Sequence, residues 1–123
     1  MTAEEERNLA AAQRWVLLYN TDPERFCDEM LTDDSEMHAR HGTPGLFGRE
    51  ACRQAVRSVL AAYPDRRIQA VALAASGDTV FAELRSQRTR AADGVAEKRH
   101  LVCVLRFRDG RVATDHDFEA MFD

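Results

Sequence analysis

The sequence predicts an α+β fold in which three N-terminal helices pack on a curved, mainly antiparallel sheet. Up to Tyr63 the apolar residues recur at the spacing of helices. After Arg66 they recur at the shorter period of strands, between the turn sequences of residues 76–78, 92–94 and 109–110. Helices that precede a run of hairpins in this way typically cover one face of the sheet that the hairpins form.

The three helices are expected over residues 2–20, 23–31 and 48–63. Thr2 and Glu5 fit a capping box at the start of the first helix. Asp22 followed by Pro23 is typical of a helix start, with a capping carboxylate and a proline in the first turn. The third helix has the clearest apolar period, and Pro64 follows its end.

Strands account for most of the remaining chain. Residues 32–35 are expected to end the second helix, and residues 36–41 are compatible with a short strand. Four longer strands are expected over residues 67–75, 79–90, 96–108 and 111–120. The stretch Leu101–Phe107 is apolar on both faces, which a sheet with one face in water would not tolerate. We therefore expect a homodimer through the outer face of the sheet.

Composition limits the classes of function. A chain of 123 residues is the size of one domain, so residues 1–123 are expected to form a single unit. A net charge of −4 argues against binding nucleic acid, which favours clustered Lys and Arg. No apolar run approaches the roughly 20 residues that cross a bilayer, so we expect no membrane association and a cytoplasmic location. The three cysteines lack C-x-x-C spacing and are expected to be reduced and buried.

Four short segments carry a resemblance to a known family; they are Gly48–Ala51, Ala62–Asp65, Ser76–Asp78 and Asp109–Arg111. In this order they resemble the SnoaL-like branch of the nuclear-transport-factor-2-like superfamily. The resemblance implies a cone-shaped fold with a deep pocket between the helices and the sheet, commonly in a homodimer. The superfamily includes polyketide cyclases, epoxide hydrolases, dehydratases, isomerases and non-catalytic ligand binders, so the resemblance indicates the fold more than the reaction.

The first helix is also similar to that of ketosteroid isomerases, which allows a test by position. Aligned without gaps, the tyrosine donor of that family falls on Trp15, its aspartate base on Ala39 and its second acid on Cys103. Tryptophan offers an N–H donor but no ionisable proton, alanine offers neither, and cysteine is a weak donor. Steroid isomerisation by that mechanism is therefore not expected.

Asp115 and Asp117 are the first catalytic candidates. They lie two residues apart on the last strand and share a face, with His116 on the other face. SnoaL-like cyclases carry a pattern resembling His-Trp-Asp here, and Asp117 takes the place of its acid/base aspartate. Two carboxyl groups in a dry pocket do not both ionise readily, so the pair can supply an acid and a base. The alternative is that the more apolar face, which includes His116 and Phe118, points toward the helices and leaves both aspartates in water.

Two further polar candidates depend on which way their strands face. Arg85 would stand near Asp117 if the polar face of its strand pointed inward, as in the paired-carboxylate arrangement of limonene epoxide hydrolases; an exposed face is the alternative. His38 is a candidate proton carrier at the pocket mouth. With His41 it has H-x-x-H spacing, but a third metal ligand is not placed by spacing, and no metal is expected.

The remaining candidates are substrate-binding residues of the pocket wall: Trp15, Tyr19, Tyr63 and Cys103. Core packing is the alternative for the three aromatic residues.

The first functional hypothesis is an enzyme that carries out cofactor-independent acid/base chemistry on a small, apolar organic substrate. Cyclisation, isomerisation and hydration of a strained ring are all compatible with it. It places Asp117 on the pocket wall with a raised pKa. The second hypothesis is a ligand-binding or assembly module without chemistry, which needs only an apolar cavity.

Overall fold

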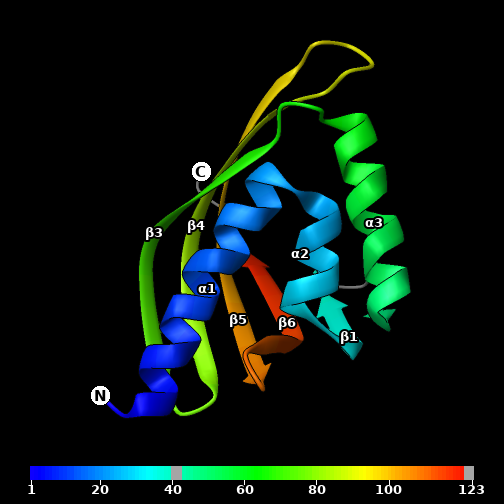
Figure 1. Ribbon diagram of the computed structural model, residues 1–123. Coiled ribbons are helices and arrows are strands. Elements are labelled where there is room, and N and C mark those ends of the chain that lie inside the picture. The colour runs from blue at the N-terminus through cyan, green and yellow to red at the C-terminus, as the bar shows by residue number, and fades with distance from the viewer. Residues whose placement is uncertain (40–42, 121–123) are drawn as a thin grey trace.

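The computed structural model describes residues 1–39 and 43–120, and it confirms the expected α+β fold. Three helices cover one face of a curved sheet, and the turn joining β4 and β5 projects beyond it (Figure 1). The six strands have the order β2-β1-β6-β5-β4-β3, with β1 and β6 parallel and the other neighbours antiparallel. The elements are α1 (Ala3–Thr21), α2 (Pro23–Met30), β1 (Leu31–His38), β2 (Leu46–Phe47), α3 (Arg49–Ala62), β3 (Arg67–Ser76), β4 (Thr79–Thr89), β5 (Ala96–Arg108) and β6 (Arg111–Glu119).

Local signals in the sequence set the starts of the helices. At the start of α1, the Thr2 hydroxyl accepts from the backbone N–H of Glu5, and the Glu5 carboxylate accepts from the backbone N–H of Thr2. The Asp22 carboxylate caps α2 in the same way, with Pro23 in its first turn. Gly48, with a φ of 94°, precedes α3 in a conformation that favours glycine. These contacts confirm the three predicted helices.

The segment after α2 differs from the prediction. The helix ends at Met30, and β1 runs over Leu31–His38 where residues 32–35 were expected only to end the helix. The reason is non-local, because β1 gains its hydrogen bonds by pairing in parallel with β6, with Leu31 opposite Val112. Of the strand compatible with residues 36–41, Arg40 and His41 lie outside the described residues.

A β-bulge in β6 decides which of its side chains face the helices. Thr114 lies opposite Arg106, but Val112 lies opposite Phe107, so Ala113 is an extra residue in the strand. Val112 and Asp115 therefore point to the same face although they are three residues apart, and both are buried. Simple alternation places these two residues on opposite faces, which is why the sequence pattern slightly favoured an outward-facing Asp115.

The core lies between the helices and the inner face of the sheet. Apolar side chains of β4, β5 and β6 pack there against the apolar faces of α1, α2 and α3, and among the fully buried members are Ala12, Phe26, Cys52, Val80, Leu105 and Val112. The outer face of the sheet carries partly exposed apolar side chains, including Phe81, Val102 and Phe118. None of the described helices combines the length and hydropathy that crossing a bilayer requires.

Candidate active site

A cavity of about 200 Å³ lies between the inner face of the sheet and the helices. This volume corresponds to roughly six or seven water molecules, at about 30 Å³ each. The wall is mainly apolar, and its polar members come from α1, β4, β5, β6 and the residue before β3; they are Trp15, Tyr19, Arg66, Ser86, Arg88, Arg99, Cys103, Asp115 and Asp117. A concave apolar site with a few polar groups is the usual form of a small-molecule site.

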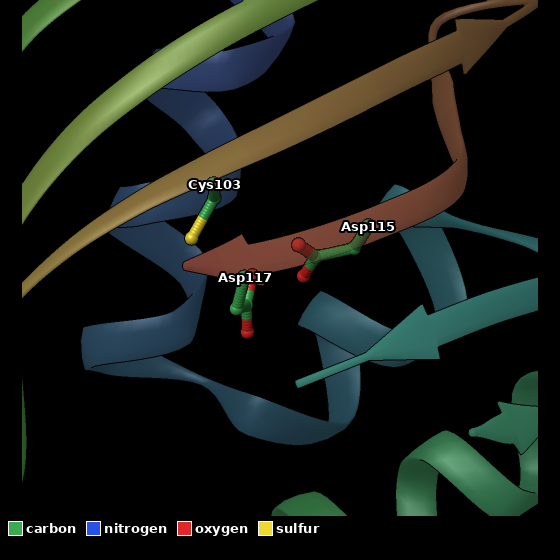
Figure 2. A group of neighbouring side chains, drawn as sticks. All are labelled: Cys103, Asp115 and Asp117. Atoms are coloured by element: carbon green, nitrogen blue, oxygen red, sulfur yellow. The ribbon is translucent and has the colours of Figure 1, made fainter. Parts of the chain in front are cut away.

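Asp115 and Asp117 both line this cavity, together with Cys103 on the neighbouring strand. The three side chains lie on the same side of β5 and β6 and come together there (Figure 2). Their ligand atoms, two carboxylate oxygens and one sulfur, all lie within 4.8 Å of one another. Pairing of Cys103 opposite Asp117 and of Leu105 opposite Asp115 produces this cluster. The structure thus favours the inward-facing alternative for the carboxylate pair.

The two carboxyl groups differ in burial. Asp115 is 3% exposed, whereas Asp117 is half-buried. Burial, followed by the negative charge of Asp117, raises the pKa of the Asp115 carboxyl well above its ordinary value. Burial and the charges of both carboxylates likewise raise the pKa of the Cys103 thiol. Two carboxyl groups this close do not both ionise readily, and Asp115 is the member of the pair whose pKa is raised.

The cavity also collects polar atoms that lack hydrogen-bond partners. Among the described residues, five buried side-chain polar atoms have none, and four of them belong to residues that line the cavity. The four are Trp15 Nε1, Arg66 Nε, Asp115 Oδ1 and Asp117 Oδ1. Buried polar groups in proteins are nearly always paired, so a cluster of unpaired ones is typical of a ligand site.

Cys103, Asp115 and Asp117 form the one group in the described part of the chain whose geometry could hold a metal ion. Cys103 and Asp115 have raised pKa values and favour their protonated forms, whereas metal binding needs deprotonated ligands. We therefore interpret the group as a carboxyl pair beside a thiol. The other spacing considered for a metal, that of His38 and His41, includes a residue outside the described ones, since His41 is not described.

Most of the predicted wall residues of the first helix and the sheet line the cavity. Trp15, Tyr19 and Cys103 are all part of it. Ala39 lines it too, so the three positions aligned with the functional residues of ketosteroid isomerases share one cavity in this chain. Trp15 is packed beside Tyr19 and Phe26, with ring centroids 6.5 and 5.6 Å away. Its pyrrole nitrogen nevertheless remains unpaired, so core packing alone does not satisfy this residue.

Three predicted site residues lie elsewhere, and these predictions are corrected. His38 lies opposite His116 in the β1–β6 pair, and their rings stack 4.6 Å apart, whereas its neighbour Met37 lines the cavity. Arg85 is exposed on the other face of β4 from the buried Leu84. Tyr63, at the end of α3, packs against Arg88, whose guanidinium carbon lies 3.9 Å from the ring centroid, and does not line the cavity.

Three arginines of the wall, Arg66, Arg88 and Arg99, were not predicted from the sequence. Arg88 and Arg99 continue the inward faces of β4 and β5 beyond Ser86 and Leu101, so strand alternation contained the signal for both. Arg66 lies just before β3, two residues before the buried Ile68, so strand alternation would place both side chains on the same face. Arg66 lies just outside the strand expected over residues 67–75, so strand alternation was not applied to it.

Comparison with known proteins places the fold in a family. Residues 12–114 match the model of the SnoaL-like domain. A proposed SnoaL-like polyketide cyclase from Jannaschia sp. CCS1 superposes with a TM-score of 0.87 at 16% identity, covering 97% of this chain and 89% of that one. IdmH, a proposed polyketide cyclase from Streptomyces antibioticus, superposes with a TM-score of 0.79 at 17% identity over 91% of each chain. A proposed ketosteroid isomerase from Kribbella flavida DSM 17836 superposes with a TM-score of 0.80 at 21% identity, covering 98% of this chain and 82% of that one.

These matches differ in what they establish. Among curated proteins, none matches the chain. The structural neighbours share too little sequence to show more than the ketosteroid isomerase-like fold. The family model covers most of the chain but stops one residue before Asp115, so the carboxyl pair lies outside the matched segment. With the fold, the resemblance and the family match in agreement, the chain belongs to the SnoaL-like domain family.

Proposed function

We propose that the protein is an enzyme that moves a proton next to a carbonyl group of a small, largely apolar organic substrate, without a cofactor. The observation that carries this proposal is the pair of carboxyl groups on the cavity wall, one deeply buried and one half-buried. A cavity used only to retain an apolar ligand gains nothing from burying an acid, because burying a carboxyl group costs free energy.

Asp117 acts as the base in this proposal. It is the more accessible member of the pair, and the charge resides on it because Asp115 keeps its proton. The largely apolar wall holds a bound substrate against this carboxylate. Trp15 supplies a hydrogen-bond donor, since its buried Nε1–H has no partner and stands at the position aligned with the tyrosine donor of ketosteroid isomerases.

The chemical step needs only these groups. The Asp117 carboxylate takes a proton from the carbon next to the carbonyl, and the C–H electron pair becomes the C=C bond of an enolate. The carbonyl π electrons move onto oxygen, which accepts a hydrogen bond from Trp15. In an isomerisation, Asp117 returns the proton to another carbon. In a cyclisation, the enolate carbon attacks a second carbonyl and the new alkoxide takes the proton.

Exchange of hydrogen for deuterium tests the proton-transfer step with a defined probe. We expect the protein to accelerate exchange at the carbons next to the carbonyl of 2-tetralone in D₂O at neutral pH, followed by NMR. Asp117→Asn should lower the rate by about 10²- to 10⁴-fold, the usual contribution of a general base. Trp15→Phe should lower it less. Asp109→Asn is the matched control, because Asp109 is exposed in a turn and does not line the cavity.

Three outcomes would contradict the proposal. An unchanged rate in folded Asp117→Asn would remove this residue from the mechanism. No acceleration by the wild-type protein would favour the ligand-binding alternative. Loss of exchange on adding EDTA, with recovery on adding zinc, would show that the carboxyl–thiol group works as a metal site.

We also propose that two copies of the chain meet through the outer face of the sheet. Phe118, Val102 and Phe81 are 59%, 38% and 45% exposed there. Phe118 lies opposite Val102 on β5, and Phe81 of β4 lies opposite Val104, two residues along β5 from Val102. Exposed apolar side chains that adjoin across neighbouring strands are typical of an interface. A partner covering this face would not reach the carboxyl pair, which lies on the opposite face.

A further inference from the structure

The positive charges of the cavity wall are compensated unequally. Arg88 donates to Glu97 at 2.7 Å, and Arg99 donates to Glu119 at 3.0 Å. Arg66 has no such partner, since none of the described carboxylates lies within ion-pair distance of it. Arg66 is nevertheless 7% exposed and lines the cavity. Unlike Arg88 and Arg99, Arg66 is thus a buried cation of the wall for which the described part of the chain supplies no carboxylate partner.

The contacts of Arg66 satisfy only part of its guanidinium. One terminal nitrogen donates to the backbone oxygen of Tyr19 at 3.0 Å, and the guanidinium carbon lies 4.4 Å from the centroid of the Tyr19 ring. These contacts hold the side chain in place. The Nε–H is buried without an acceptor. Burying an unpaired charge is costly, so such a group indicates an anion that binds it.

Arg66 lies at the opposite end of the cavity from the carboxyl pair. Ile68 pairs with Ser86 and Ser86 with Arg99, four residues along β5 from Cys103. Arg66 precedes Ile68 by two residues, so at about 3.3 Å per residue its backbone lies roughly 20 Å along the strands from Cys103. The cavity therefore has a carboxyl end and a guanidinium end, and the wall between them includes Leu84, Leu101 and the ion-paired Arg99.

We infer that the ligand of this cavity carries a carboxylate, which Arg66 binds while the apolar part of the ligand extends toward Asp115 and Asp117. A carboxylate accepts charge-assisted hydrogen bonds from a guanidinium in a favourable planar geometry. The negative charge on the carboxyl pair repels a second anion, so only one orientation of the ligand is favourable. The inference deepens the proposed function by naming a substrate class, but binding itself does not depend on turnover.

Paired probes of the same shape test this inference. We choose 4-phenylbutyrate and its neutral counterpart 4-phenylbutyramide, which do not react in the proposed step. Trp15 is the one tryptophan of the chain and lines the cavity, so its fluorescence reports binding, with calorimetry as a second measurement. For the wild-type protein we expect the carboxylate to bind at least about tenfold more tightly than the amide.

Variants locate the selectivity. Arg66→Gln should abolish the preference for the carboxylate and leave the affinity of the amide unchanged, while Arg66→Lys should retain part of the preference. Arg67→Gln is the matched control, because Arg67 is the next residue and is exposed. It should leave both affinities unchanged. Asp117→Asn should keep the preference for the carboxylate even though it loses proton transfer, which separates this inference from the proposed function.

The inference is overturned if the wild-type protein binds both probes equally, or binds neither. It is also overturned if folded Arg66→Gln loses affinity for both probes to the same extent, since Arg66 would then only support the cavity wall. The comparison of the two probes on wild-type protein needs no variant, so it decides the question even if Arg66→Gln does not fold.

Discussion

Replacing Asp115 with asparagine should stabilise the folded protein at neutral pH. The carboxyl group is buried beside Asp117, and its pKa is raised well above the ordinary value by burial and by that neighbouring charge. In the unfolded chain the same group ionises near its reference pKa of about 3.9. Asparagine has nearly the shape of the protonated acid and carries no ionisable proton, so it removes the cost of holding the proton.

The direction of the pH dependence follows from proton counts. Above about pH 4 the unfolded chain has released the Asp115 proton, whereas the folded chain keeps it until the pH reaches the raised pKa. The folded state then binds one more proton than the unfolded state, so the contribution of Asp115 to the free energy of unfolding falls as pH rises. The slope is about 1.4 kcal/mol per pH unit within that window, and it ends at the folded pKa.

Urea unfolding of wild type and Asp115→Asn between pH 4 and pH 8 measures this slope. The difference in free energy of unfolding should be small at pH 4 and should grow in favour of the variant with increasing pH. Taking the difference cancels the other carboxylates, such as Glu24, whose pKa is lowered to about 2 by hydrogen bonds from Arg57 and Arg53. Asp109→Asn, at an exposed turn position, should give a flat difference. Parallel curves for wild type and Asp115→Asn would refute the assignment of a protonated, buried acid.

Two other properties should follow from the structure. Phe118→Asp, on the outer sheet face, should shift the protein from dimer to monomer in light scattering, and a wild-type monomer at high concentration would refute the proposed interface. All three cysteines are buried, and burial raises the pKa of Cys27 to about 11, so the native protein should react with a thiol reagent at pH 8 far more slowly than the urea-unfolded chain. Rapid reaction of one thiol in the native protein would contradict this.

Local signals explain which parts of the fold the sequence predicted. The Thr2 capping box, the Asp22–Pro23 start and the turn sequences between strands act over a few residues, and each produced the expected element. The start of β1 at Leu31 depends on pairing with Val112, far along the chain, and a single sequence does not record that pairing. The prediction therefore failed where hydrogen bonds cross between distant segments.

The residues of the candidate site also differ in how far local sequence signals could place them. Trp15 and Tyr19 lie on the apolar stripe of a helix, so helical spacing alone was enough to place them on the inner side. For Arg85 and His38 the expected role required a strand face that the structure does not give them. Arg66 was missed because it precedes its strand, although its unpaired, buried guanidinium is among the most informative features of the cavity.

The extra residue at position 113 should be essential for placing the carboxyl pair. Without it, Val112 and Asp115 would fall on opposite faces, so deletion of Ala113 forces either Val112 outward or the aspartates away from the cavity. Exposing a fully buried valine costs about 1.5–3 kcal/mol. Because Asp115 is costly to bury, we expect the strand beyond the deletion to rotate its carboxyl groups to the outer face and lose the exchange of 2-tetralone. Ala113→Gly keeps the residue count and should retain exchange. If the deletion variant retains wild-type exchange, the bulge does not position the pair.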